Sequence, residues 1–274
     1  MLGQLIGEVF GTFILILLGD GVVANVGLAP RLDSAAYNWN TITFGWAFAV
    51  IVAVYVSAGV SGAHLNTAVT IALAAKRGFP WGKVFPYILA QIVGAFLGAA
   101  GVYLVYMDGL VAAGMPNVWS TGPGSVMTAA YWGGIGSGVA GTVKVSYSYL
   151  NCVIAEIVGT AVLLWGILGS GDSKNTGLMH NLGPFLVGGT VLAVGLSLGG
   201  PSGYAINPAR DFGPRLFGQL VGTPGFDTSY WLIPLLAPIV GAVIGIFLYD
   251  WLVEANLPKP EPLGAKTQGA AADD

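Results

Sequence analysis

Residues 61–68 read Ser-Gly-Ala-His-Leu-Asn-Thr-Ala, and residues 202–209 repeat the pattern as Ser-Gly-Tyr-Ala-Ile-Asn-Pro-Ala. In each copy an Asn stands where a helix N-cap is expected, and Thr67 or Pro208 follows at the first helical position. A helix over 66–76 extends only about 16 Å at about 1.5 Å per residue, half of a hydrocarbon core of about 30 Å. The repeat therefore predicts two re-entrant half-helices, over 66–76 and 207–218.

The composition is that of a polytopic membrane protein. Hydrophobic residues make up 55% of the 274 and charged residues only 8%, and the mean hydropathy is +0.75, whereas soluble domains are about one quarter charged. The net charge of -3 offers no basic surface for nucleic acid. One cysteine and two histidines favour neither a disulfide nor a metal site. We expect no metal and no cofactor.

Six apolar segments reach the length of about 20 residues that a bilayer requires. They cover 4–27, 40–60, 84–107, 148–170, 181–200 and 231–253. The two half-helices follow the second and the fifth. Each half of the chain therefore contains three spans and one half-helix, and three crossings place the second half in the opposite orientation.

Further similarity between the halves supports this arrangement. Residues 6–12 resemble 154–160, and residues 90–95 resemble 237–242. An odd number of spans with internal similarity predicts an inverted-topology repeat with the functional site between the halves. The fold class is an all-α membrane protein with six transmembrane helices and two half-helices: repeat 1–107, extracellular loop 108–147, repeat 148–254 and disordered cytoplasmic tail 255–274.

Basic residues predict the orientation of the spans. Six of the eight lysines and arginines in the loops and tail fall on one side and two on the other. The larger group is Lys76, Arg77, Lys83, Lys174, Lys259 and Lys266, and the smaller is Arg31 and Lys144. By the positive-inside rule both termini are cytoplasmic.

Irregular backbone at membrane depth must be buried in protein or line a wet cavity, so the two motifs indicate a pore. The half-helices would meet with N-termini that each carry about half a positive charge, which repels cations. We expect Asn66 and Asn207 to cap their helices with the side-chain oxygen and to offer the amide NH₂ to the lumen. One such motif alone would indicate only an ordinary helix start.

Four other polar residues within apolar segments need an explanation. Arg210, three residues after Asn207, is interpreted as a pore residue, the alternative being a structural ion pair with Asp211 or Asp33. Glu8 and Glu156 occupy equivalent places, and we expect them to accept hydrogen bonds from the loop amides; the alternative is a proton relay. His64 is expected to brace its loop or line the lumen.

These motifs resemble the two signature loops of the major intrinsic proteins, the aquaporin and glycerol-facilitator family, and the resemblance covers about 4–253. Asp211 after Arg210, and Pro234-Leu235 in the last span, are similar to the glycerol-conducting branch. The resemblance implies a homotetramer with one pore per subunit. It also implies a selectivity filter of Trp46, Gly195, Tyr204 and Arg210, and a ladder of carbonyl groups from Gly62, Ala63, His64, Gly203, Tyr204 and Ala205.

The sequence departs from the family pattern at two positions. Thr67 stands where the family usually has Pro; we expect its hydroxyl to be idle, because Asn66 supplies the cap, and the alternative is a bond to the second loop or into the lumen. Tyr204 stands where glycerol facilitators commonly have Phe, which adds a hydroxyl to the filter.

The predicted function is a passive channel of the plasma membrane, without enzymatic activity, for small neutral solutes. The resemblance implies glycerol, dihydroxyacetone, undissociated lactic acid, urea and some water, with ions and protons excluded. The sequence contains no ATP-binding Gly-x-x-x-x-Gly-Lys-Ser/Thr motif. The rivals are a proton-coupled secondary transporter that uses Glu8 and Glu156, and a non-conducting junction protein of the same fold.

Overall fold

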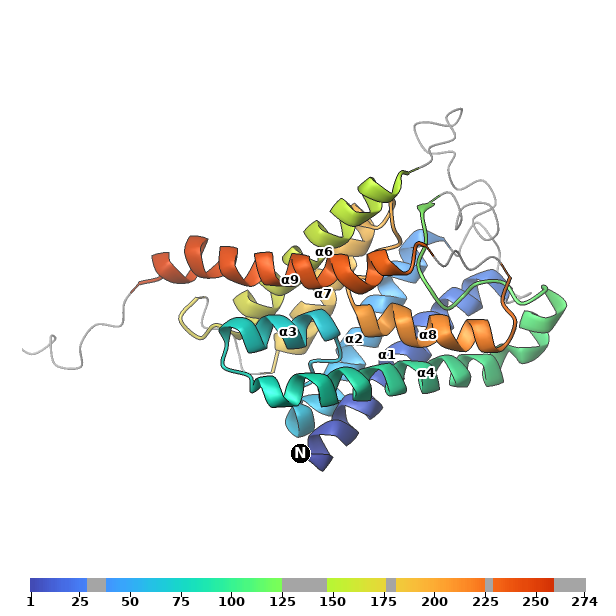
Figure 1. Cartoon of the computed structure of the whole chain (residues 1–274), viewed down its shortest axis with the longest axis horizontal. Coiled ribbons are helices and arrows are strands. Elements are labelled where there is room, and N and C mark those ends of the chain that lie inside the picture. Colours follow the sequence, from blue (N-terminus) through green and yellow to red (C-terminus); the bar gives the residue numbers. More distant parts are fainter. Residues whose placement is uncertain (29–37, 125–146, 176–180, 225–228, 259–274) are drawn as a thin grey trace, which may run out of the picture.

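The computed structural model describes residues 1–28, 38–124, 147–175, 181–224 and 229–258, and within them the architecture is helical (Figure 1). Asn66 and Asn207 precede the half-helices α3 and α8 as N-caps, as the sequence predicts. The helices are α1 (Leu2–Leu28), α2 (Trp39–Ser61), α3 (Thr67–Lys76), α4 (Trp81–Ala112), α6 (Tyr149–Gly171), α7 (Gly183–Leu198), α8 (Pro208–Leu220) and α9 (Leu232–Leu252).

Five helices in the described part of the chain are long and apolar enough to cross a membrane, namely α1, α2, α4, α6 and α9. The predicted span over 181–200 is shorter than expected, because α7 has only 16 residues. Pro184 lies in its first turn, where proline favours a helix start. Gly199, Gly200 and Pro201 follow its last residue and prevent its continuation.

The helix contacts follow a twofold pattern. Helix α1 packs against α2 and α4, and its counterpart α6 packs against α7 and α9. Each half-helix crosses to the other repeat, since α3 packs against α9 and α8 against α4. Helices α2 and α7 join the two halves directly. The prediction of an inverted repeat agrees with this exchange.

Two equivalent glycines allow the first and last spans of each repeat to approach closely. A Cβ atom on Gly94 of α4 would lie 2.3 Å from the carbonyl oxygen of Val9 on α1. A Cβ on Gly241 of α9 would lie 2.2 Å from the carbonyl oxygen of Ile157 on α6. Small residues at helix crossings are the usual means of close packing in lipid.

The half-helices meet in the middle of the molecule. Figure 1 shows α3 and α8 on opposite sides of the centre, with their N-terminal ends facing each other. Each extends away from the centre, which leaves the loops before them side by side. The pore motifs, 141 residues apart in sequence, are therefore neighbours.

The segment predicted as an extracellular loop, 108–147, is described only in part. Helix α4 continues to Ala112, so the loop begins five residues later than predicted. Trp119 and Thr121 in the segment that follows are buried and bond to residues of α8 or the turn after it. Residues 125–146, and residues 259–274 of the predicted tail, lie outside the described part.

Candidate functional site

The loops before α3 and α8 share one backbone conformation. Left-handed backbone is unfavourable for residues with a side chain, at roughly 1–3 kcal/mol each. Positive φ angles occur at equivalent positions: Gly62 (86°), Ala63 (48°) and Leu65 (48°) in the first loop, and Gly203 (83°), Tyr204 (41°) and Ile206 (43°) in the second. Because four of these six are not glycine, the surrounding structure must hold both loops in shape.

Glu8 of α1 holds the first loop. Its Oε1 accepts hydrogen bonds from the Ser61 hydroxyl (2.7 Å) and the His64 amide (3.0 Å), and its Oε2 accepts one from the Leu65 amide (2.8 Å). The carboxylate is completely buried. Since the loop directs its N–H groups to this carboxylate, its carbonyl oxygens remain as the acceptors available to a solute.

Glu156 of α6 holds the second loop in the same way. Its Oε1 accepts from the Ser202 hydroxyl (2.7 Å) and the Ala205 amide (2.8 Å), and its Oε2 accepts from the Ile206 amide (2.7 Å). It too is completely buried. These are the contacts expected of two equivalent structural carboxylates, and they occupy every carboxylate oxygen.

Asn66 and Asn207 cap the two half-helices. Asn66 Oδ1 accepts from the amides of Ala68 (2.9 Å) and Val69 (3.4 Å). Asn207 Oδ1 accepts from the amides of Ala209 (3.1 Å) and Arg210 (3.3 Å). Each cap satisfies orphan donors of the first turn and fixes the orientation of the remaining amide group.

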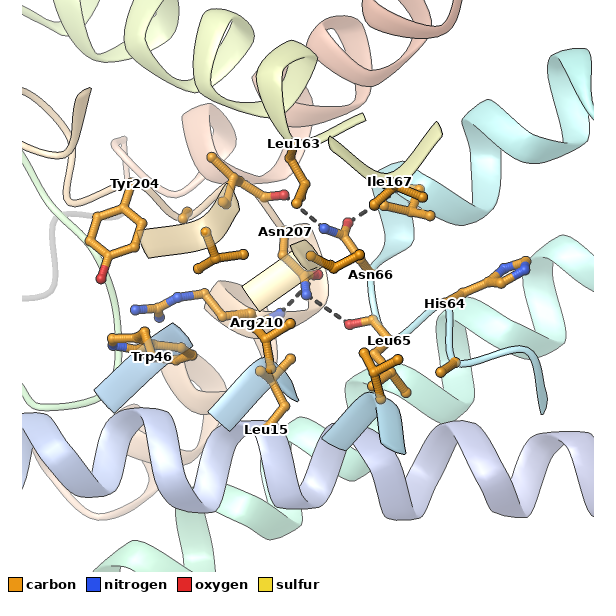
Figure 2. Close-up of a pocket in the computed structure, with 18 of the residues that line it drawn as sticks. Leu15, Trp46, His64, Leu65, Asn66, Leu163, Ile167, Tyr204, Asn207 and Arg210 are labelled. Carbon is orange, nitrogen blue, oxygen red and sulfur yellow. Dashed lines mark hydrogen bonds between the residues drawn. The ribbon is translucent and has the colours of Figure 1, made fainter. Parts of the chain in front are cut away.

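The amide groups of these two asparagines also join the loops, which corrects the prediction that they face only the lumen. Asn66 Nδ2 donates to the Ile206 carbonyl (2.8 Å), and Asn207 Nδ2 donates to the Leu65 carbonyl (2.7 Å; Figure 2). A primary amide has two hydrogens, so one donor per asparagine remains for a solute. The loops therefore make contact although Thr67 replaces proline.

The expected filter residues Trp46, Tyr204 and Arg210 come together at one end of the cavity (Figure 2). The Arg210 guanidinium carbon lies 4.1 Å from the centroid of the Trp46 ring. Helix α2 supplies Trp46, and Arg210 stands on the first turn of α8. Figure 2 shows the asparagine pair in the middle and His64 at the other end. This end of the cavity thus combines aromatic faces with one cation.

Gly195 does not line the cavity with these three side chains, contrary to expectation. A Cβ on Gly195 would lie 2.8 Å from Cζ of Tyr204, so the glycine makes room for the Tyr204 ring. The Gly195 carbonyl accepts a hydrogen bond from the Trp39 indole (2.9 Å), and this indole packs edge-on to Tyr204. Gly195 therefore acts on the filter through the position of Tyr204.

The carboxylate near Arg210 is Asp20 of α1, which the sequence reasoning did not consider. Asp20 Oδ1 lies 3.8 Å from Arg210 Nη1. Asp211 instead accepts from Arg215 (2.7 Å) and from the hydroxyl and amide of Thr121 (2.6 and 2.7 Å). Asp211 thus supports the loop after α4, and Asp33, the other predicted partner, lies outside the described residues.

The prediction that the Thr67 hydroxyl is idle is wrong. Thr67 Oγ1 donates to Gln91 Oε1 of α4 (3.1 Å). Gln91 Nε2 donates to Glu8 Oε2 (2.8 Å) and to Thr70 Oγ1 (2.9 Å), and Thr70 Oγ1 contacts His64 Nδ1 (3.1 Å). The bond leads neither to the second loop nor to the lumen. Instead, Thr67 belongs to a buried network around the first carboxylate.

Between the loops and the spans lies a cavity of about 190 Å³. The first loop contributes Gly62, Ala63 and His64 to its lining, and the second contributes Tyr204 and Ala205, but not Gly203. The rest of the lining is largely aliphatic: Leu15, Val50, Val54, Val69, Leu73, Leu163, Ile167, Val187 and Val191. The cavity therefore has polar groups on its loop side and an apolar wall opposite.

Membrane-length helices, two facing half-helices and a cavity between inverted repeats define a polytopic membrane protein of the channel class. The chain belongs to the major intrinsic protein family, whose model matches residues 1–249. The members of this family are channels and not enzymes.

Individual relatives agree with this assignment. The chain is 45% identical to the probable glycerol uptake facilitator protein of Thermotoga maritima, over 90% of this chain and 98% of the relative. It is 40% identical to aquaglyceroporin-3 of Trypanosoma brucei brucei, over 90% of this chain and 77% of the relative. The solved aquaglyceroporin of Plasmodium falciparum superposes with a TM-score of 0.79 at 32% identity, over 92% of this chain and 96% of that one. These relatives are glycerol facilitators and aquaglyceroporins.

Sequence reasoning missed three contributors to the site: Asp20, Gln91 and Trp119. Asp20 stands in an apolar span, and a lone carboxylate in such a segment is itself a functional signal. Gln91 belongs to the repeated segment 90–95 and is the polar residue in it. Trp119, whose carbonyl lies 3.4 Å from Arg210 Nη1, carries no signal in sequence.

Proposed function

We propose that this protein is a passive channel for glycerol and similar small hydroxylated molecules, with some water, and that it excludes ions and protons. The observation that carries the proposal is the two-sided cavity, in which loop carbonyls and Arg210 face aliphatic side chains. A polyol has hydroxyls on one side of a C–H backbone and can satisfy both surfaces at once. Dihydroxyacetone and undissociated lactic acid share this chemistry.

The residues of the expected filter support the selection of such a solute. Trp46 and the Tyr204 ring offer apolar faces, while Arg210 is a hydrogen-bond donor in a residue that is only 8% exposed. Tyr204 Oη is buried and has no hydrogen-bond partner among the described residues. It therefore has an unused hydrogen-bonding capacity beside the cavity, which the phenylalanine of related channels lacks.

The middle of the cavity supports the exclusion of cations. The N-termini of α3 and α8 face each other there, and each carries about half a positive charge. The free amide hydrogens of Asn66 and Asn207 are donors, which suit the oxygen of a neutral solute. Arg210 adds a full positive charge at one end.

The contacts of Glu8 and Glu156 argue against the rival proton-coupled transporter. Every oxygen of both side chains accepts a bond from its loop. Protonation of either carboxylate would break at least one of these bonds and disturb a strained loop. A relay group needs a proton site that is free during the cycle.

We further propose a homotetramer in the plasma membrane with both termini cytoplasmic. Lys83 bonds to Gln4 near the N-terminus (3.1 Å), and Arg77 pairs with Asp250 at the end of α9 and with Glu254 just after it. The basic segment 76–83 therefore lies at the same end of the molecule as Gln4 and the end of α9. The positive-inside rule makes this end cytoplasmic.

Stopped-flow measurements on proteoliposomes test the proposal with glycerol, dihydroxyacetone, lactic acid, urea and water. We expect solute flux that follows the concentration gradient without saturating and that is fastest for the polyols. Val191→Trp, which fills the cavity wall, should abolish glycerol flux, whereas Val240→Trp on the exposed face of α9 should leave it unchanged. Equal glycerol flux in both folded variants would show that the cavity is not the path.

A further inference from the structure

Asp20 is a buried carboxylate that the pore mechanism above does not use. It stands within α1 and is 0% exposed. Neither of its oxygens has a hydrogen-bond partner among the described residues. A charged side chain inside a membrane span is costly and is retained for a partner or a function. The question is what this carboxylate acts upon.

The charged group that lies near Asp20 is the guanidinium of Arg210. Arg210 Nη1 lies 3.8 Å from Asp20 Oδ1, beyond hydrogen-bond length but within the range of an ion pair. The other acidic residue nearby, Asp211, is occupied by Arg215 and Thr121. Among the described residues, the two carboxylates and two guanidinium groups therefore form two pairs.

The packing of α1 places this carboxylate behind the filter. A Cβ on Gly19 would lie 2.3 Å from the Trp46 ring, so α1 approaches the back of that ring. The Arg210 guanidinium lies over the same ring, 4.1 Å from its centroid. Asp20 is absent from the cavity lining, whereas Trp46 and Arg210 belong to it. Asp20 can act on a solute only through Arg210.

We propose that Asp20 is the counter-ion and positioning residue of Arg210, and that it sets the specificity of the filter for neutral over anionic solutes. It draws Nη1 toward α1, together with the Trp119 carbonyl at 3.4 Å, and leaves the remaining N–H groups for solute hydroxyls. It also cancels the charge that would otherwise attract anions to the filter. This inference rests on the proposed function.

Asp20→Asn tests the inference, because it removes the charge and keeps the shape. In proteoliposomes we expect chloride leak relative to glycerol flux to rise roughly 2- to 150-fold, the range of coupling between contacting charged residues. The effect should vanish in an Arg210→Val background, since the charge that attracts chloride is gone. Thr12→Val, which alters another buried, unpartnered polar group of α1, is the matched control and should leave the ratio unchanged.

An unchanged chloride-to-glycerol ratio in folded Asp20→Asn, or additive effects of the two substitutions, would overturn the inference. If Asp20→Asn alone does not fold, the double variant decides. If Asp20 and Arg210 are paired, the double variant Asp20→Asn, Arg210→Val should fold where Asp20→Asn alone does not. A double variant that also fails to fold contradicts the pairing. Absence of glycerol flux in the parent would refute the proposed function but leave this folding test intact.

Discussion

The two pore loops share one frame and differ in the residues that give it chemistry. Both have a buried glutamate, three positive φ angles and a capping asparagine that reaches across to the other loop. The positions that differ include Val69 against Arg210, Ala63 against Tyr204, Thr67 against Pro208 and Gln91 against Pro238. The residues that are repeated hold the two loops in the same conformation, and the residues that differ give the two ends of the cavity different chemistry.

The first two of these pairs make one end of the cavity chemically different from the other. Val69 and Ala63 line the cavity with small apolar groups, whereas their counterparts Arg210 and Tyr204, which line it too, belong to the proposed filter. A channel needs one narrow selective region, and a second would only slow the solute. The inverted repeat supplies a symmetric scaffold. Differences at these two positions give the two ends of the cavity different chemistry.

The other two pairs show two ways to fix a half-helix. In the second repeat Pro208 fixes the first turn by its restricted φ. In the first repeat Thr67 keeps its N–H and binds Gln91, which in turn binds Glu8 (3.1 and 2.8 Å). Proline at position 238 offers no such donor. The pair Thr67 and Gln91 therefore replaces a local restraint with a buried hydrogen-bond network.

The largest expected effect comes from neutralising the carboxylates, and it should differ between the repeats. Glu156→Gln places an amide NH₂ against loop donors that have no alternative acceptor, and we expect a loss of about 2–5 kcal/mol of stability. Glu8→Gln should lose less stability, because Gln91 can rotate its amide and accept a hydrogen bond from the NH₂ group of the new glutamine. The melting temperatures of the two folded variants measure the difference.

Equal losses, or a larger loss for Glu8→Gln, would contradict the role given to Gln91. Flux per folded pore is the accompanying measurement. It should fall less than the yield of folded protein, since the substitution acts on loop order. Normal folding with transport that no longer responds to pH would instead support a proton relay.

Arg210→Val gives the second repeat the residue of the first and should remove the difference between the two ends. The helix dipoles remain, but the full charge of the filter is lost. We expect ion or proton leak to rise by about tenfold, equivalent to about 1.4 kcal/mol, and the solute ranking to flatten. Conductance of proteoliposomes measures the leak. If neither leak nor ranking changes, the filter assignment fails.

Thr67→Pro gives the first repeat the residue of the second and should be mildly destabilising. It breaks the bond to Gln91, at about 1–3 kcal/mol, while proline restores up to about 1 kcal/mol through the unfolded chain. Thr67→Val is the control, because it removes the hydroxyl and keeps the backbone N–H. A higher melting temperature for Thr67→Pro than for the parent would show that the bond to Gln91 contributes less than the proline restraint, contrary to this expectation.

Tyr204→Phe should have the smallest effect, confined to solute preference. The ring and its packing against Trp39 remain, and only an unpartnered hydroxyl is removed. We expect the ratio of glycerol to water permeability to change by less than about threefold, which corresponds to less than about 0.7 kcal/mol. An equal change in both permeabilities would mean that the hydroxyl does not contact solute.

The sequence was sufficient for the frame of the site because the frame is repeated. Two copies of the Asn motif and two equivalent glutamates allowed the half-helices and their carboxylates to be predicted from sequence alone. The position of Gly195 behind Tyr204, the bond from Thr67 to Gln91 and the approach of Asp20 to Arg210 were not predictable. Each depends on side-chain packing between helices that are distant in sequence.

The central claim is that the cavity conducts solute passively, and glycerol flux under an imposed proton gradient tests it most directly. Proteoliposomes would be prepared with equal and unequal pH across the membrane, and glycerol entry followed over a series of glycerol gradients. The account predicts entry that is linear in the glycerol gradient and the same at every proton gradient. Glycerol accumulation above equilibrium when a proton gradient is imposed would contradict it.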